Sequence, residues 1–451
     1  MNRKNKSAIM TLAASAIFTA SAETQNPAQN QARKTTDFLD SIGIVTTFPD
    51  RGQPLEKTIE MVNYCGFRWV RGGIEGLSEK EDGRTTIDTY IKLCKATGMK
   101  ANWGLVSGGS DLDKLLRTAR RLHEEGVLLA FEGNNEPNNW GVVYKGEKGG
   151  RNGSWVALAN LQSDMYKAVK ADPQYKKYPV WGASEMGAQT DNVGMHFLEI
   201  PEGADTVMPA GTKYQDALNV HNYIYHPNSP RYEDNKTWNC ADPGPACKVD
   251  GLWGNHGVTW GKKFKGYGEA ELADIPRVTT ETGTTIGGDV TEEIHALHLT
   301  NIYLAQFARG WSHTSVYLLR DRTDEGGNQT FGFYDRDYKP RKAALYLHNL
   351  TTVLQDKGDG ETQAAGTLAY AIENRTPTVH DLLLQHSSGK FQLVVWGEKA
   401  KGSDTVTVRF PAPKSVKIFD VTKGVEPVRT LEATSSFDLE MSDHPFVLEV
   451  K

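Results

Sequence analysis

The sequence predicts an α/β fold in which a (β/α)8 TIM barrel is followed by a small C-terminal β-sandwich. From Asp40 to Asp356, eight short apolar runs alternate with amphipathic segments, which is the pattern of β-α units around a parallel sheet. After Lys357 the helical pattern ceases, and short alternating runs follow one another between polar turns. A doubly wound open sheet is the alternative for the first part. It is disfavoured because no glycine-rich phosphate turn follows the first strand.

The apolar runs are short and are bounded by turn residues, as strands buried in a barrel should be. Strands are expected at Ile42–Phe48, Phe67–Ile74, Lys100–Val106, Val127–Glu136, Tyr178–Glu185, Ala217–Tyr225, Arg277–Thr282 and Thr314–Arg320. Helices with apolar residues at helical spacing are expected at Pro54–Tyr64, Asp111–Glu125, Glu292–Ala308 and Arg341–Leu354.

The N-terminus has the composition of an export signal. Arg3, Lys4 and Lys6 precede a short apolar stretch, and Ala20-Ser21-Ala22 has the small-x-small pattern of a cleavage site. The expected location is therefore secreted or periplasmic, with an uncleaved membrane anchor as the alternative. The expected divisions are a signal peptide over 1–22, a disordered Gln/Asn-rich leader over 23–36, the barrel over 37–356 and the sandwich over 357–451.

Charge and cysteine content limit the partners. The 451 residues carry a net charge of -5 without a long basic run, so nucleic acid is not an expected partner, and no later stretch is apolar enough to cross a membrane. Cys240 and Cys247 could form a local disulfide bond, whereas Cys65 and Cys94 could pair or remain two buried thiols. The cysteine spacings match no zinc pattern, and no metal or cofactor is expected.

The stretch Phe131–Asn139, which reads FEGNNEPNN, carries the clearest chemical signal. It follows the apolar run of the fourth strand, and Glu132, Asn134 and Glu136 share one face of that strand. A polar face on an apolar strand costs stability unless its groups are paired or used. The alternative interpretation is a strand that ends in an Asn-Pro turn with a chance glutamate.

This stretch resembles the acid/base strand of the (β/α)8 retaining glycoside hydrolases of clan A. In those enzymes the strand has the form W-E-x-x-N-E-P-N, and here Phe131 stands in place of Trp. Thr280-Glu281-Thr282-Gly283 is similar to the T-E-x-G end of the clan's nucleophile strand. Family 39 is the nearest and family 5 is a looser match. The resemblance implies a hydrolase that cleaves β-glycosidic bonds of an oligo- or polysaccharide by double displacement, without a cofactor, and the N-terminal signal pattern implies that it is secreted.

By this resemblance Glu136 is the general acid/base and Glu281 the nucleophile. Retention of configuration requires their carboxyl groups to lie about 5–5.5 Å apart. Arg71 and Tyr223 should keep Glu281 ionised, whereas partial burial and a nearby anion should raise the pKa of Glu136. Asn135 is expected to hydrogen-bond the 2-hydroxyl of the sugar.

Other side chains at the C-terminal strand ends should face the site, because these ends meet at one mouth of a barrel. Aromatic side chains there suit the apolar faces of sugar rings. The residues expected to bind the substrate or support the site are Arg71, Asn102, Trp103, Asn135, His221, Tyr223, Trp311, Tyr317 and Arg320. Trp140, Tyr144 and Tyr225 are expected at the same rim, and Glu132 should pair with an arginine inside the barrel.

The segment His226–Lys265 interrupts the β-α rhythm. It is long, rich in Pro and Gly, and contains Trp238, Trp253 and Trp260, so we expect a wall or lid over the cleft. A disulfide-pinned insertion without a function is the alternative. Two other functions compete with hydrolysis. A barrel that binds glycan without cleaving it would have the same strands, whereas a metal-dependent hydrolase would need more His and Asp ligands than His221.

Overall fold

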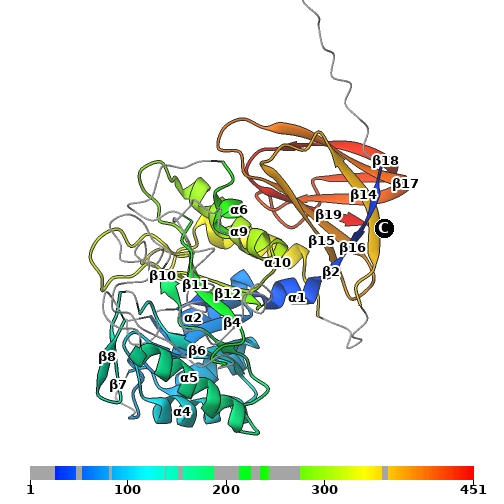
Figure 1. Cartoon of the computed structure of the whole chain (residues 1–451). Coiled ribbons are helices and arrows are strands. Elements are labelled where there is room, and N and C mark those ends of the chain that lie inside the picture. The colour runs from blue at the N-terminus through cyan, green and yellow to red at the C-terminus, as the bar shows by residue number, and fades with distance from the viewer. Residues whose placement is uncertain are drawn as a thin grey trace, which may run out of the picture.

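The computed structural model describes residues 26–46, 53–80, 84–137, 139–150, 156–186, 213–224, 234–242, 275–357 and 364–451. The expected signal peptide, most of His226–Lys265 and Cys247 lie outside these residues. In the described part, a strand-lined barrel packs beside a second all-β unit (Figure 1). No described helix is long and apolar enough to span a membrane.

Parallel strands form the barrel in the order β10-β11-β12-β13-β3-β4-β5-β6-β9. β9 and β10 are two pieces of the fifth strand, because β9 pairs with β6 and β10 pairs with β11, and a bridge between Trp181 and Ala217 closes the ring. The predicted barrel is therefore confirmed. Its strands are β3 Ile42–Val45, β4 Trp69–Gly73, β5 Lys100–Val106, β6 Leu128–Asn134, β9 Val180–Trp181, β10 Glu185–Met186, β11 Leu218–His221, β12 Arg277–Thr282 and β13 Trp311–Val316.

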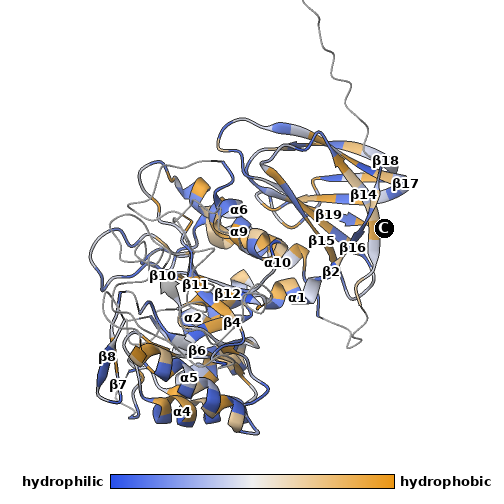
Figure 2. Ribbon diagram, viewed as in Figure 1, coloured by the Kyte–Doolittle hydropathy of each residue, from blue (hydrophilic) through white to orange (hydrophobic). Residues whose placement is uncertain are grey.

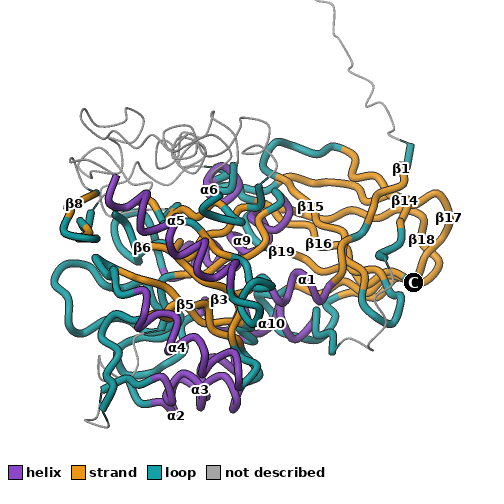
Figure 3. The backbone as a smooth tube through the Cα atoms, turned by 60° about the horizontal axis from the view of Figure 1, so that its bottom comes forward, coloured by secondary structure: helices purple, strands orange, loops and turns teal. Residues whose placement is uncertain are grey.

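Helices lie outside the strands of the barrel (Figure 3). Hydrophobic and hydrophilic residues are mixed along them, as helices with one buried side require (Figure 2). Gly66 and Gly98 end two of them in the left-handed conformation, at φ 78° and 75°. The helices are α1 Thr35–Asp40, α2 Leu55–Cys65, α3 Ile87–Thr97, α4 Leu112–Glu124, α5 Val156–Ala171, α6 Lys236–Cys240, α9 Glu292–Ala308 and α10 Lys342–Val353.

The base of the barrel is filled by large apolar side chains. The Trp69 ring meets the Trp181 ring edge to face, with centroids 5.5 Å apart. Gly43 pairs with Trp69 in the neighbouring strand, and a Cβ at Gly43 would lie 2.1 Å from the indole, so no larger residue fits there. Because strand side chains alternate, Arg71 lies two residues along β4 on the same inner face as Trp69. The apolar base is thus followed, one step up, by a polar layer.

The second unit is the predicted β-sandwich. β16 is buried on both sides, because Leu393 and Val395 face the sandwich core whereas Val394 and Trp396 belong to the cluster that includes the barrel helices. This explains the unbroken apolar run in that strand. The strands are β14 Thr367–Glu373, β15 Val379–Gln385, β16 Phe391–Gly397, β17 Asp404–Asp420, β18 Arg429–Met441 and β19 Pro445–Val450.

The expectation of a disordered leader over residues 23–36 is wrong for its described part. β1 Ala28–Gln31 pairs antiparallel with β14, and β2 Arg33–Lys34 pairs parallel with β15 (Figure 1). Ala32 is buried in the sandwich core between them. The polar composition of this segment suggested disorder. Its strands are ordered because they pair with the edges of a sheet formed by residues more than 300 positions later in the chain.

Two of the cysteines are free thiols buried in the barrel core. Burial raises the pKa of both Cys65 and Cys94 to about 12, and neither forms a disulfide bond. Cys240 is also buried, and its thiol donates to the carbonyl oxygen of Asn222 at 2.7 Å.

The described part of the predicted lid, residues 234–242, is held by the sandwich. The Glu398 carboxylate accepts hydrogen bonds from the backbone N–H of Thr237 at 2.9 Å and of Trp238 at 3.1 Å, and from the Trp396 indole at 3.2 Å. The Trp238 ring stacks on His380, with centroids 4.0 Å apart. This acidic group is buried, and burial raises the pKa of Glu398.

We expect Glu398→Ala to destabilise the fold, because each buried donor left without an acceptor costs roughly 1–3 kcal/mol. The measurement is urea unfolding followed by tryptophan fluorescence. Glu440→Ala, which removes an exposed glutamate from the same sandwich, should leave the free energy of unfolding almost unchanged. Equal midpoints for the two variants would contradict the proposed role of Glu398.

Candidate active site

Arg71 is the centre of the polar layer at the mouth of the barrel. Its guanidinium contacts Glu132 Oε1 at 2.6 Å, Glu281 Oε1 at 2.7 Å and Asn135 Oδ1 at 2.8 Å. Burial alone would lower the pKa of Arg71, but the two carboxylates outweigh burial and raise it. The pairing of Glu132 with an arginine is as predicted.

Glu132 is fully buried beneath the site and holds Arg71 in place. Asn102 donates to one of its oxygens, and the Thr280 hydroxyl donates to the other at 2.8 Å. Because the contacts of this carboxylate come from side chains of β4, β5, β11 and β12, Glu132 fixes these strands relative to one another across the barrel. Asn102 therefore supports the site from below, without reaching the cavity.

Glu281, at the end of β12, receives two strong donors. Arg71 Nη1 lies 2.7 Å from Oε1, and the Tyr223 hydroxyl donates to Oε2 at 2.8 Å. Both contacts are hydrogen bonds to the carboxylate, and the one from Arg71 is also an ion pair. These are the two residues that the sequence assigned to Glu281.

Glu136 follows β6 in a conformation that is uncommon for a residue with a side chain. Its φ is 41°, in the left-handed region, which costs about 1–3 kcal/mol and is found mostly at functional sites. Its side chain contacts His221 Nδ1 at 2.8 Å and accepts from Asn139 Nδ2 at 2.9 Å. The same His221 nitrogen lies 3.4 Å from Glu281 Oε2.

The two glutamates meet at the mouth of the barrel. One carboxylate oxygen of Glu136, one of Glu281 and a ring nitrogen of His221 all lie within 4.8 Å of one another. They come from three strand ends, and β11 and β12 place His221 opposite Glu281 in the sheet register. The structure thus brings together residues that are far apart along the chain.

The expectation that the pKa of Glu136 is raised is wrong for the ligand-free protein. Burial does raise it, but the hydrogen bonds from His221 and Asn139 and the charge of Arg71 outweigh burial, so the pKa of Glu136 lies below its ordinary value. The sequence placed His221 at a neighbouring strand end, but strand pattern alone does not reveal a contact of 2.8 Å.

The hydrogen bonds behind His221 determine how the Glu136–His221 pair holds its protons. His221 Nε2 lies 3.0 Å from Thr280 Oγ1, whose hydroxyl donates to Glu132. Because Thr280 has only one hydroxyl proton, Nε2 must donate to Thr280. The contact of 2.8 Å between Nδ1 and Glu136 then holds one proton, which Nδ1 donates to the Glu136 carboxylate. That proton lies between the two side chains.

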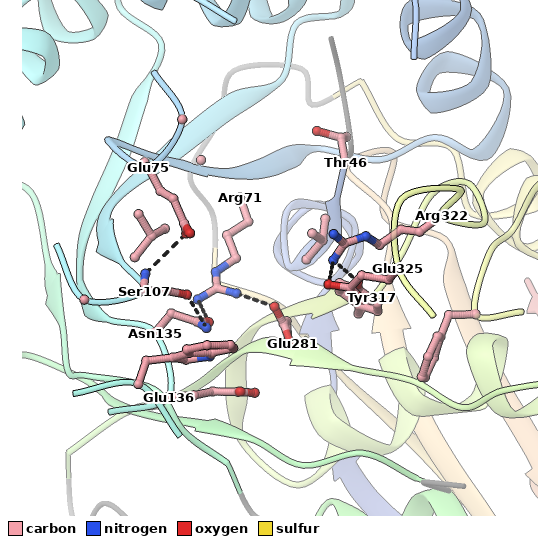
Figure 4. A pocket seen from close by; sticks show the side chains of 18 of the residues that line it. Thr46, Arg71, Glu75, Ser107, Asn135, Glu136, Glu281, Tyr317, Arg322 and Glu325 are labelled. Atoms are coloured by element: carbon pink, nitrogen blue, oxygen red, sulfur yellow. Dashed lines mark hydrogen bonds and ion pairs between the residues drawn. The ribbon is translucent and has the colours of Figure 1, made fainter. Parts of the chain in front are cut away.

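A cavity of about 900 Å³ opens above these residues (Figure 4). Arg71, Asn135, Glu136, Tyr223, Glu281 and Tyr317 all line it, together with Trp140. The sequence analysis missed Arg322, Glu325 and Gln329, which also line it. Arg322 donates to the Tyr317 hydroxyl at 2.9 Å and pairs with Glu325 at 2.5 Å.

Trp103, Trp311 and Arg320 do not line the cavity, which corrects the prediction for them. Trp103 points outward from β5, and its indole donates to the Thr118 hydroxyl of α4 at 2.8 Å. Alternation along the strand explains this, because its neighbour Asn102 points inward. Trp311 begins β13 and so lies at the opposite end of the barrel. Arg320 lies beyond that strand, with its guanidinium over the Tyr338 ring.

Comparison with known proteins supports the architecture. No family model matches the sequence, and no curated protein matches it. A family 39 glycoside hydrolase from the gut symbiont Bacteroides cellulosilyticus WH2 has a similar structure, with a TM-score of 0.58 and 15% identity over 92% of this chain and 82% of that chain. This chain has the fold of the clan A glycoside hydrolases.

Two further solved structures agree with the clan A fold over nearly the whole chain. A GH51 arabinofuranosidase from Xanthomonas axonopodis pv. citri matches with a TM-score of 0.55 and 11% identity over 95% of this chain and 98% of that chain. A glycoside hydrolase family 30 subfamily 8 xylanase from Clostridium acetobutylicum matches with a TM-score of 0.52 and 12% identity, over 94% and 97%. The likeness includes both the barrel and the sheet unit that follows it.

We expect His221→Leu to raise the pKa of Glu136, because the variant removes the donor that opposes the effect of burial. The measurement is an NMR titration of protein labelled at the glutamate carboxyl carbons, with the Glu136 signal assigned from Glu136→Gln. Asn139→Ala should cause a smaller rise. His348→Leu, on the outside of the barrel, is the matched control and should cause none. A Glu136 signal that titrates alike in all three variants would contradict this account.

Proposed function

We propose that the protein is a retaining glycoside hydrolase that cleaves β-glycosidic bonds of an oligo- or polysaccharide. The observation that carries this proposal is the approach of Glu136 and Glu281 to within 4.8 Å, oxygen to oxygen, at the mouth of a barrel. This spacing fits the separation of about 5–5.5 Å used for double displacement. It is too short for the water that inverting enzymes hold between carboxyls about 6.5–9.5 Å apart. The shared fold with solved glycoside hydrolases supports the same class.

In the first step Glu281 attacks the anomeric carbon while Glu136 gives its proton to the leaving oxygen. Arg71 and Tyr223 hold the Glu281 carboxylate in place at the cavity by hydrogen bonds. Once the glycosyl–enzyme bond has formed, the charge of Glu281 is lost, and Glu136 takes a proton from the incoming water. The proton held between Glu136 and His221 supplies the acid in the first step. Asn135, fixed by Arg71, lines the cavity where it can bond the 2-hydroxyl of the sugar.

The grouping of Glu136, His221 and Glu281 also has the spacing of a metal site. One contact argues against that use. The guanidinium of Arg71 already lies 2.7 Å from Glu281, so a second cation on the same carboxylate would be repelled. Glycan binding without cleavage is the other alternative, and it gives no reason for holding an acid/base residue in a strained conformation.

We expect Glu136→Gln to lower kcat for a natural glycan about 10²–10⁴-fold while substrate binding persists, because the proton donor is lost but the cavity is kept. Glu281→Gln should abolish turnover. The measurements are reducing-end assays over a panel of aryl glycosides and polysaccharides, with binding followed by calorimetry. The exposed Glu124→Gln on α4 is the control. Full activity of Glu136→Gln would refute the assigned acid, and binding without turnover in the wild type would favour the non-catalytic alternative.

The stereochemical course tests the double displacement separately. We expect ¹H NMR of the first product to show the configuration of the substrate. Azide should rescue Glu281→Gly with the inverted glycosyl azide, and Glu136→Ala with the retained one, because azide replaces a different partner in each case. Including α-L-arabinofuranosides beside β-glycosides in the panel identifies the bond cleaved. Inversion by the wild type would contradict the proposed mechanism.

Removal of metal ions should leave activity unchanged. We expect kcat/KM after dialysis against EDTA to equal that of the untreated protein, because Arg71 supplies the positive charge beside Glu281. The comparison is made on one substrate in matched metal-free buffer. A loss that Zn²⁺ or Mn²⁺ restores would transfer the assignment to metal-dependent hydrolysis.

We also propose that the protein is exported to act on an extracellular or periplasmic glycan. The support is the basic, apolar and small-residue pattern of residues 1–22. N-terminal sequencing of protein recovered outside the cytoplasm should begin at Glu23. An intact N-terminus on cytoplasmic protein would refute export.

A further inference from the structure

Trp140 is a large apolar side chain left in solvent beside the candidate catalytic acid. It is 49% exposed and lines the cavity. The aromatic residues Tyr223, Tyr317 and Phe331, which also line the cavity, pack edge to face against one another, with centroids 5.3–6.4 Å apart. The Trp140 indole, which is half exposed at the cavity wall, therefore has a face free to stack on a ligand in the cavity.

The backbone ties Trp140 to the acid. The N–H groups of Asn139 and Trp140 both donate to the Glu136 carbonyl oxygen, at 2.7 and 2.8 Å. Gly150 packs against the same turn, where a Cβ would lie 2.6 Å from the Pro137 carbonyl oxygen. The turn that displays the indole is therefore the turn that sets the left-handed conformation of Glu136.

A short hairpin behind Trp140 fixes this turn to the barrel. β7 Val142–Tyr144 pairs with β8 Glu147–Gly149, and the Tyr144 hydroxyl donates to Asp164 of α5 at 2.9 Å. Lys145 pairs with the same carboxylate at 2.8 Å. Because the hairpin is anchored, the position of the indole is set before any ligand binds, which lowers the entropic cost of stacking.

The roles of the two glutamates determine which part of the substrate Trp140 meets. The general acid delivers its proton to the leaving oxygen, so the leaving sugar must lie on the Glu136 side of the site. Tyr317, Arg322 and Glu325 lie on the other side of Glu281 from Glu136 (Figure 4). The cavity thus has a charged wall away from the acid and an aromatic side chain next to it.

We propose that Trp140 is the platform for the leaving-group sugar, and that the substrate class is a glycan with a further sugar ring on that side of the scissile bond. This assignment rests on the proposed glycosidase function. The indole face stacks on the apolar C–H face of that ring during the first step. The same face then holds an acceptor sugar in place of water during the second step, so Trp140 also favours transfer over hydrolysis.

The test compares two substrates that share the glycosyl group and differ in the leaving group. One is the shortest oligosaccharide that the wild type cleaves, and the other is the matching glycosyl fluoride, whose leaving group is too small to reach the indole. We expect Trp140→Ala to lower kcat/KM for the oligosaccharide about tenfold or more and to change that for the fluoride less than about twofold. Trp140→Phe should restore part of the loss. The ratio of transfer to hydrolysis, measured with added acceptor sugar, should fall in Trp140→Ala.

Val143→Ala is the control, because Val143 is 53% exposed on the same hairpin but does not line the cavity. An equal loss on both substrates would show that Trp140 only supports the fold of the Glu136 turn, and would overturn the proposal. No loss on either substrate would also overturn it. Failure of the glycosidase function gives a different result, since the wild type would then cleave neither substrate and Glu136→Gln would match the wild type on both.

Discussion

The site depends on one buried cation, the guanidinium of Arg71. A buried charge is stable only when its interactions offset the cost of removing it from water. Arg71 makes four hydrogen bonds of 2.6–3.1 Å, and their acceptors are in Glu132, Glu281 and Asn135. These partners come from β6 and β12 and from the residue that follows β6, so the requirement fixes the relative position of strands that are not neighbours. Removing either carboxylate would leave part of the buried positive charge of Arg71 unbalanced. The residues of the polar layer therefore depend on one another.

The same layer gives the two candidate catalytic glutamates different hydrogen-bond partners. Glu281 receives hydrogen bonds from the Arg71 guanidinium and the Tyr223 hydroxyl. Glu136 instead contacts His221 Nδ1 at 2.8 Å. Two carboxyl groups whose oxygens lie within 4.8 Å of each other thus have different surroundings, as the proposed double displacement requires.

The sequence sufficed for the features that depend on strand period and chain order. It placed Glu136 and Glu281 together at the mouth of the barrel, and it predicted both bounds of β12 and the inward pairing of Glu132 with an arginine. It failed at the eighth strand. Trp311 precedes even the predicted start of that strand and so lies at the base of the barrel, and the arginine that lines the cavity is Arg322 instead of Arg320. The sequence also failed to predict β1 and β2. These strands are ordered by pairing with β14 and β15, and the local sequence contains no strand pattern that would predict them.

The sandwich has a physical connection to the chemistry through the segment 234–242. Glu398 of the sandwich holds the first turn of α6, and Cys240 at the end of α6 donates to the carbonyl oxygen of Asn222. Asn222 returns the contact with its amide at 3.1 Å, and it directly precedes Tyr223, which donates to Glu281. The Thr282 hydroxyl donates to the same Asn222 carbonyl at 2.8 Å. A shift of the sandwich against the barrel would therefore move Tyr223, the donor to the candidate nucleophile Glu281. This gives the two units a reason to pack through a shared apolar core.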